Sequence, residues 1–124
     1  MLLMSIEIPS VDDLLNFVDD SCNSDLRLSA ILPAVSSSID ASISTAVYND
    51  PDTARISLGF PKSQSAVVVL VDGLGYWNLA IRKGHAPYLR YLLNDCANQR
   101  PIKTCIPSTT VAAMATFGTG TCPG

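Results

Sequence analysis

The stretch that most constrains the fold is "VVVLVDGLG", residues 67–75. Its first five residues are apolar without any polar alternation, which favours a strand buried on both faces of a sheet. That strand runs directly into Asp72, and Gly73 and Gly75 then allow the backbone to turn sharply and approach a bound group. An Asp-Gly pair after a strand is more often a plain turn. We nevertheless interpret Asp72 as a metal ligand at the carboxyl end of a buried parallel strand.

The segments after Asp72 predict the rest of an α/β fold. Residues 76–95 have the apolar spacing of a helix, interrupted near Gly84–Pro87. "RPIKTCI", residues 100–106, reads as a second strand, and "STTVAAMATF", residues 108–117, reads as a helix that begins with hydroxyl residues. Strand, helix, strand, helix is the pattern of a parallel sheet with flanking helices, incomplete in this chain.

The amino-terminal residues have a different character. We predict one helix over residues 10–20 and a second that begins at Pro33, a natural first helical position. Residues 48–65 crowd Pro, Asp, Asn and Gly and read as turn and linker, with "ARISL" (54–58) as a short edge strand. The chain is therefore divided into a leading helical segment and linker, 1–62, and an α/β part, 63–124.

Composition excludes several classes of protein. The 124 residues carry a net charge of −3 and no basic run, which argues against a nucleic-acid-binding surface. The longest apolar run, "AVVVLV", is too short to span a bilayer, and "MLLMSIEIPS" lacks the features of a secretory signal, so we interpret the protein as cytoplasmic. The four cysteines form no CxxC pair and are read as reduced thiols, and the single histidine, His85, cannot build a metal site alone.

The order of the elements brings two chemical groups together. Ligands of open parallel sheets gather outside the carboxyl ends of the strands, where both Asp72 and residues 107–110 are expected to lie. Thr110 would then stand near a helix N-terminus, which favours a phosphate group. A coordinated metal lowers the pKa of a hydroxyl, so Thr110 could attack phosphorus, although a Ser-Thr-Thr run before a helix is usually only a cap.

Taken together, "VVVLVDGLG", "HAPYLRYLL" and "RPIKTCIPSTTVAAMATFGTGTCPG" resemble the alkaline phosphatase superfamily. Within it, the closest likeness is to the type I phosphodiesterase/nucleotide pyrophosphatase branch, over about residues 65–124. The resemblance implies a metal-dependent hydrolase that cleaves phosphodiester or pyrophosphate bonds of nucleotide-like small molecules. It also implies an alkaline-phosphatase-like fold and two divalent metal ions, with zinc as the expected metal.

The resemblance also implies roles for individual residues. The family's first metal-binding aspartate follows a buried strand and precedes glycine, which here is Asp72. Its nucleophile is a Thr three positions after a Pro and nine before the Thr of a Thr-Gly pair. Pro107 and the Thr119–Gly120 pair give Thr110 both spacings. Thr110 is therefore the expected nucleophile and a ligand of one metal, with Thr109 as the alternative.

The sequence departs from the family pattern in two ways. Small apolar residues, Val111 to Ala113, follow Thr110 where many members have an asparagine, which leaves the substrate subtype open. The remaining metal ligands of the family lie later in its sequences, after a His-Gly pair that would follow Gly124. One carboxylate and one hydroxyl cannot hold two metals, because a zinc site needs about four ligands. We therefore expect an inactive amino-terminal fragment of a longer enzyme.

Other functions are compatible with the same residues. An enzyme of the same fold could cleave a phosphomonoester or a phosphonate instead of a diester. A non-catalytic module could use the "DGLG" turn and the helix start only to bind a nucleotide. The chain could also be a truncated product without activity. The sequence specifies neither the physiological substrate nor the oligomeric state.

Overall fold

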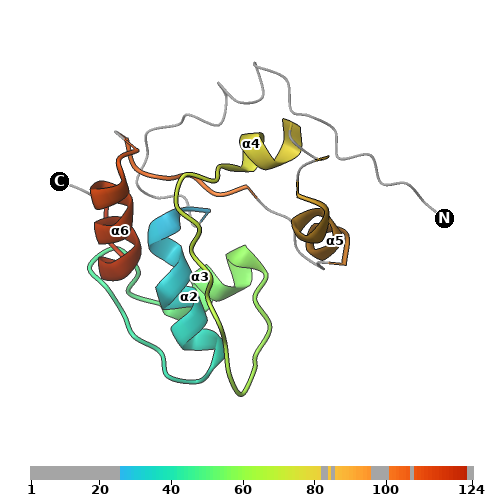
Figure 1. Cartoon of the computed structure of the whole chain (residues 1–124). Coiled ribbons are helices and arrows are strands. Elements are labelled where there is room, and N and C mark those ends of the chain that lie inside the picture. The colour runs from blue at the N-terminus through green and yellow to red at the C-terminus, as the bar shows by residue number, and fades with distance from the viewer. Residues whose placement is uncertain (1–25, 82–83, 85, 96–100, 107, 123–124) are drawn as a thin grey trace. The chain divides into compact units, whose positions relative to one another are not determined.

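A computed structural model describes residues 26–81, 84, 86–95, 101–106 and 108–122 (Figure 1). The chain forms two compact units, one made of Met1–Asp20 with Gly73–Gln99 and the other of Ser21–Asp72 with Arg100–Gly124. The predicted boundary between residues 62 and 63 falls inside the second unit, and the proposed division into a leading segment and an α/β part stays a prediction. The helix predicted over residues 10–20 lies outside the described residues.

The second unit begins with a 3₁₀ helix, η1 (Leu28–Ala30), that leads into α2 (Ile31–Ser38). A helix was predicted here and is confirmed, but it begins two residues before Pro33. Proline is tolerated at the third helical position because the first backbone N–H groups of a helix have no intrahelical acceptor. The preceding 3₁₀ turn, rather than the proline, therefore sets where the helix starts.

Residues 51–58 form a helix, α3 (Pro51–Leu58), and the predicted edge strand at residues 54–58 is wrong. Asp50 caps the helix by accepting a hydrogen bond from the backbone N–H of Asp52 at 3.1 Å, and Pro51 supplies the first helical residue. Gly59 ends the helix with a left-handed backbone, φ +72°. These signals at the two ends outweigh the weak strand preference of the residues between them.

Helices α2 and α3 pack against each other and enclose the hydrophobic core of the second unit. Small side chains let the two helices approach closely, and Tyr48 closes one side with its hydroxyl 3.1 Å from the buried hydroxyl of Ser29. The buried core residues are Ala30, Ala34, Tyr48, Ala54 and Leu58, with Leu26, Ile31 and Phe60 packed against them. The best-packed part of this unit is thus built by residues that precede the predicted α/β region.

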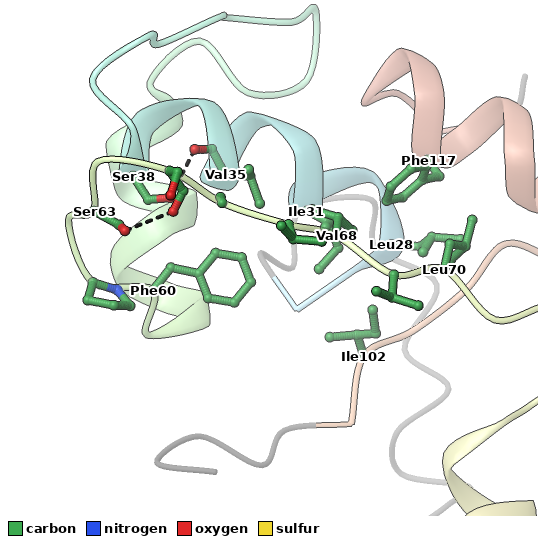
Figure 2. Close-up of a pocket in the computed structure, with 15 residues that line it drawn as sticks. Leu28, Ile31, Val35, Ser38, Phe60, Ser63, Val68, Leu70, Ile102 and Phe117 are labelled. Atoms are coloured by element: carbon green, nitrogen blue, oxygen red, sulfur yellow. Dashed lines mark hydrogen bonds between the residues drawn. The ribbon is translucent and has the colours of Figure 1, made fainter. Parts of the chain in front are cut away.

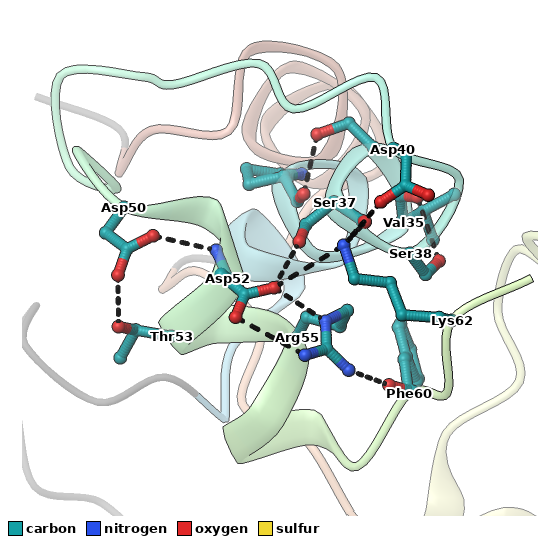
Figure 3. Close-up of polar contacts among 12 residues, drawn as sticks. Val35, Ser37, Ser38, Asp40, Asp50, Asp52, Thr53, Arg55, Phe60 and Lys62 are labelled. Atoms are coloured by element: carbon teal, nitrogen blue, oxygen red, sulfur yellow. Dashed lines mark hydrogen bonds and ion pairs between the residues drawn. The ribbon is translucent and has the colours of Figure 1, made fainter.

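A polar network joins α2, α3 and the loop after α3 (Figure 3). The Asp52 carboxylate accepts hydrogen bonds from Arg55 Nε and from the hydroxyl of Ser37, each at 2.8 Å. Lys62 donates to the backbone oxygen of Ser37 and forms an ion pair with Asp40 at 2.7 Å. The hydrogen bonds from Arg55 and then from Ser37 lower the pKa of Asp52 to about 2.

The two predicted strands of the α/β part do not form a ladder in the described residues. Residues 65–71 have no strand assignment, and residues 101–106 make a single parallel bridge, Arg27 with Lys103. That bridge carries two backbone hydrogen bonds, from Leu28 N–H to the Lys103 oxygen at 2.8 Å and from Lys103 N–H to the Leu26 oxygen at 2.9 Å. A parallel sheet with flanking helices therefore stays a prediction.

The helix predicted over residues 108–117 is confirmed as α6 (Thr110–Thr119), which contacts η1 and α2. In the first unit, α4 (Tyr76–Ile81) and α5 (Pro87–Asp95) confirm the predicted helical region and its interruption near Gly84–Pro87. None of the helices within the described ranges is both long and apolar enough to cross a membrane. Cys105 is buried and Cys122 is half-buried, whereas Cys22, Cys96 and His85 lie outside the described residues.

Candidate functional site

The structure brings Asp72 and Thr110 into contact, although 38 positions separate them in the sequence. The hydroxyl of Thr110 donates to the Asp72 carboxylate, 3.2 Å from Oδ2 and 3.3 Å from Oδ1. Both residues belong to the second compact unit and both are exposed to solvent. An acidic oxygen and an alcohol oxygen therefore meet at an accessible position, which is the geometry that a shared metal or phosphate ligand would need.

The cap of α6 decides which of the two threonines is presented. Thr109 has an extended backbone (φ −85°, ψ 152°), and its side-chain oxygen accepts a hydrogen bond from Ala112 N–H at 3.3 Å. Thr109 thus serves as the N-cap, which occupies its hydroxyl oxygen in holding the helix end. Thr110 is the first helical residue and its hydroxyl is directed to Asp72 instead. Thr109 therefore caps the helix, whereas the hydroxyl of Thr110 faces Asp72.

The helix start also supplies favourable electrostatics for an anion. The backbone N–H groups of Thr110 and Val111 lie in the first turn of the helix and have no intrahelical acceptor. They can therefore bind an external oxygen. Helix α6 has ten residues, and the positive end of its dipole lies at this terminus. A phosphate oxygen beside Thr110 would be favoured by both effects.

Asp72 is placed by the backbone on either side of it. Residues 65–71 reach it without helix or turn, and Gly73 follows with φ +68°, a conformation that side chains strongly disfavour. A Cβ on Gly73 would meet no atom within 4 Å, so the backbone angle and not close packing requires glycine there. Gly75, by contrast, has no positive φ, and the predicted sharp turn depends on Gly73 alone.

The opposite end of α6 is anchored by Gly120. This residue ends the helix in the left-handed conformation, φ +63°. A Cβ there would lie 2.8 Å from Thr45 Cγ2 and 3.2 Å from Pro33 Cγ, and Thr45 Oγ1 donates to the Gly120 oxygen at 3.0 Å. In the sequence analysis, the Thr119–Gly120 pair served only to define a spacing from Thr110. In the structure, it is where α6 packs on the amino-terminal residues. Sequence reasoning missed this role, although a glycine directly after a helix was the available signal.

A divalent metal fits the two side chains only in part. A carboxylate and a hydroxyl are hard oxygen donors of the kind that zinc and magnesium accept. Among the described residues, however, no group of three or more His, Cys, Asp or Glu side chains is close enough to hold a metal ion. Asp72 and Thr110 can supply two ligands, and further ligands would have to come from elsewhere.

Comparison with known families gives a match in the same part of the chain. Residues 66–124 match the family model described as type I phosphodiesterase / nucleotide pyrophosphatase. The expected resemblance is confirmed over this segment. No curated protein and no solved structure matched the chain.

The match to this phosphodiesterase family includes the residues that define the site. Asp72, Thr110 and Gly120 all lie within residues 66–124, whereas Pro33 and Thr45, which pack against Gly120, lie outside the matched segment. The family is one of hydrolases, which supports an enzyme as the protein that carries the matched segment. The roles of Asp72 and Thr110 as ligand and nucleophile stay predictions.

Proposed function

We propose that a protein containing this segment hydrolyses phosphodiester or pyrophosphate bonds of nucleotide-like small molecules, with Thr110 as nucleophile. The observation that carries the proposal is the contact between the Thr110 hydroxyl and the Asp72 carboxylate at 3.2 Å, at the N-terminus of α6. The family match over residues 66–124 supports the same reaction class. A binding module would not need a hydroxyl directed at a carboxylate.

In this proposal, each residue of the site has a defined task. Thr110 Oγ1 forms a bond to phosphorus while the bond from phosphorus to the leaving oxygen breaks, and the hydroxyl proton is lost to the surroundings. Water then hydrolyses the phospho-threonine and returns the free hydroxyl. The N-terminus of α6 holds the phosphate oxygens and Thr109 keeps the helix start rigid.

Two divalent metals, with zinc as our expectation, would complete this site together with ligands supplied from elsewhere. Asp72 and Thr110 would hold them, as judged from the hard oxygens that the two side chains bring together. When bound, such metals lower the pKa of a coordinated hydroxyl and stabilise the charge on the leaving oxygen. We further propose a small-molecule phosphoester as the substrate.

The experiment is a hydrolysis assay on the full-length protein that carries this segment, using a chromogenic phosphodiester with zinc. Thr110→Ala is expected to lower kcat by about a thousandfold or more, as for loss of a nucleophile. Thr109→Ala is the matched control, because it removes the neighbouring hydroxyl and weakens only the helix cap, so it should retain most activity. Addition of a chelator should abolish turnover.

Two results would contradict the proposal. Full activity in Thr110→Ala would exclude this hydroxyl as the nucleophile, and hydrolysis that survives the chelator would exclude the metals. A chromogenic monoester, run in parallel, distinguishes a phosphomonoesterase of the same fold from the proposed diesterase by its relative kcat/KM. Nucleotide affinity without any hydrolysis would identify a binding module instead.

A further inference from the structure

The two ends of α6 are held in different ways. At its amino end, Thr110 is exposed, and its hydroxyl reaches the exposed Asp72 carboxylate at 3.2 Å. At its carboxyl end, Gly120 is buried, and a Cβ there would meet Thr45 and Pro33. A hydrogen-bonded helix moves as one body, so the buried end of α6 determines where the exposed end lies.

The apolar packing beneath α6 is incomplete. Phe117 points from α6 towards Leu28 and Leu70, and all three side chains line a cavity of about 490 Å³ (Figure 2). Side chains that border an open space lack contacts on that side, so they constrain a helix less than a filled core does. The position of α6 therefore depends strongly on its polar links to the amino-terminal residues.

Thr45 supplies such a link through one hydroxyl. Thr45 Oγ1 donates to the Gly120 oxygen at 3.0 Å and accepts from the Tyr48 N–H, also at 3.0 Å. The Thr45 N–H in turn donates to the Tyr48 oxygen at 2.9 Å. Tyr48 is buried, and its hydroxyl lies 3.1 Å from the hydroxyl of Ser29 in η1. Hydrogen bonds through Thr45 and Tyr48 thus join the end of α6 to η1.

We propose that Thr45 is a positioning residue for Thr110 and acts through the carboxyl end of α6. Its hydroxyl fixes the end of the helix, and the helix sets the distance from the Thr110 hydroxyl to the Asp72 carboxylate. The effect on turnover rests on the proposed function, whereas the effect on this distance does not. Thr45 lies outside residues 66–124, so the amino-terminal residues contribute to the site without touching the substrate.

The action of Thr45 on Thr110 is geometric. The ten residues of α6 span about 15 Å, and the Thr45 side chain carries no charge. A small rotation or shift of the helix at Gly120 is carried along it to Thr110. Misplacement of a reacting group by about 1 Å can lower a rate by on the order of a hundredfold. A hydroxyl remote from the reacting atoms can therefore influence kcat.

The first test measures geometry and requires neither a metal nor turnover. The γ2-methyl signal of Thr110 is followed by NMR in the chain with methyl-labelled threonine. Asp72→Ala removes the carboxylate and gives the chemical shift of the broken contact. Thr45→Val should move the Thr110 signal towards that value, because the hydroxyl link to Gly120 is lost. Thr45→Ser keeps the hydroxyl and should leave the signal close to its native position.

The second test measures turnover in the full-length protein that carries this segment. Thr45→Val should lower kcat and kcat/KM together by about tenfold, with KM little changed, because only the placement of the nucleophile is altered. Thr45→Ser should retain most of the rate. Thr53→Val is the matched control, since it removes an exposed hydroxyl of α3 that donates to Asp50 Oδ2 at 2.8 Å in the same compact unit. It should leave kcat unchanged.

The inference fails under any of three results. A Thr110 methyl signal that does not move in Thr45→Val would show that Thr45 does not position this residue. An equal loss of kcat in Thr53→Val would assign the effect to lower stability of the unit, and an equal loss in Thr45→Ser would exclude the hydroxyl as the cause. If the native protein hydrolyses no phosphoester, the proposed function fails, and the methyl signal still decides the positioning role.

Discussion

Where α2 packs against α3, small apolar side chains are buried between the two helices, and an ion network around Asp52 covers them. The segment that leads to Asp72 is the reverse, because its valines are exposed and its backbone has no neighbouring strand among the described residues. Both lie in the same compact unit. The comparison teaches that stability in this unit is concentrated in residues before the matched segment, whereas the candidate chemistry lies within it.

The strongest test of this difference in stability is to truncate one side chain in each region. Leu58→Ala removes a side chain that is 4% exposed, and we expect it to lower the free energy of unfolding by about 3 kcal/mol. Val67→Ala, in the exposed segment, should change it by less than about 0.5 kcal/mol. Urea denaturation of dilute protein, followed by circular dichroism, measures both. Similar losses in the two variants would contradict the comparison.

The packing of α6 on the amino-terminal residues is tested at Gly120. Gly120→Ala forces a side chain into the left-handed backbone and against Thr45, so we expect a loss of about 2 kcal/mol in the free energy of unfolding. Gly118→Ala is the matched control within α6, because a Cβ there meets no atom within 4 Å. It should be neutral or slightly stabilising. If both substitutions were tolerated equally, α6 would not depend on this packing.

A smaller effect is expected at Thr116, a buried residue of α6. Its hydroxyl oxygen is buried and has no hydrogen-bond partner among the described residues. Thr116→Val removes an unsatisfied polar group with little change of shape and should stabilise the protein by about 1 kcal/mol. Thr119→Val is the control, because the Thr119 hydroxyl donates to the Ala115 oxygen at 2.7 Å and its removal should not stabilise. A destabilised Thr116→Val would indicate an interaction that this account lacks.

The smallest expected effect on stability concerns the ion network around Asp52, beside α2 and α3. The pKa of Asp52 falls from 3.8 to about 2 on folding, because Arg55 and then Ser37 donate hydrogen bonds to its carboxylate. A group whose pKa is lowered by folding stabilises the folded state above its unfolded pKa, and this contribution is lost as the pH falls through the folded value. The stability difference between the native chain and Asp52→Asn should therefore be constant above about pH 4 and shrink towards pH 2. A difference that does not vary with pH in this range would exclude the network as its source.

How far the sequence predicts this molecule depends on where its signals lie. A helix in this region follows from local hydroxyl and small residues, although it was expected to begin at residue 108 and begins at Thr110. The contact between Asp72 and Thr110 agrees with the expected order of strand and helix ends. Helix α3 was missed because the Pro, Asp, Asn and Gly residues that crowd residues 48–65 were interpreted as a turn and linker, whereas Asp50 and Gly59 cap the two ends of a helix. Strand pairing of residues 65–71 cannot be read from their composition, since a strand needs a neighbour that composition does not specify.

The central claim is that Thr110, directed at Asp72, becomes covalently bound to phosphorus during turnover. The most direct measurement is an acid quench of the full-length protein during hydrolysis of a phosphodiester, followed by peptide mapping of the bound phosphoryl group. The account predicts the group on Thr110 in the native protein and no labelled peptide in Thr110→Ala, with labelling retained in Thr109→Ala. A phosphoryl group on Thr109, or rapid hydrolysis with no covalent intermediate at all, would contradict it.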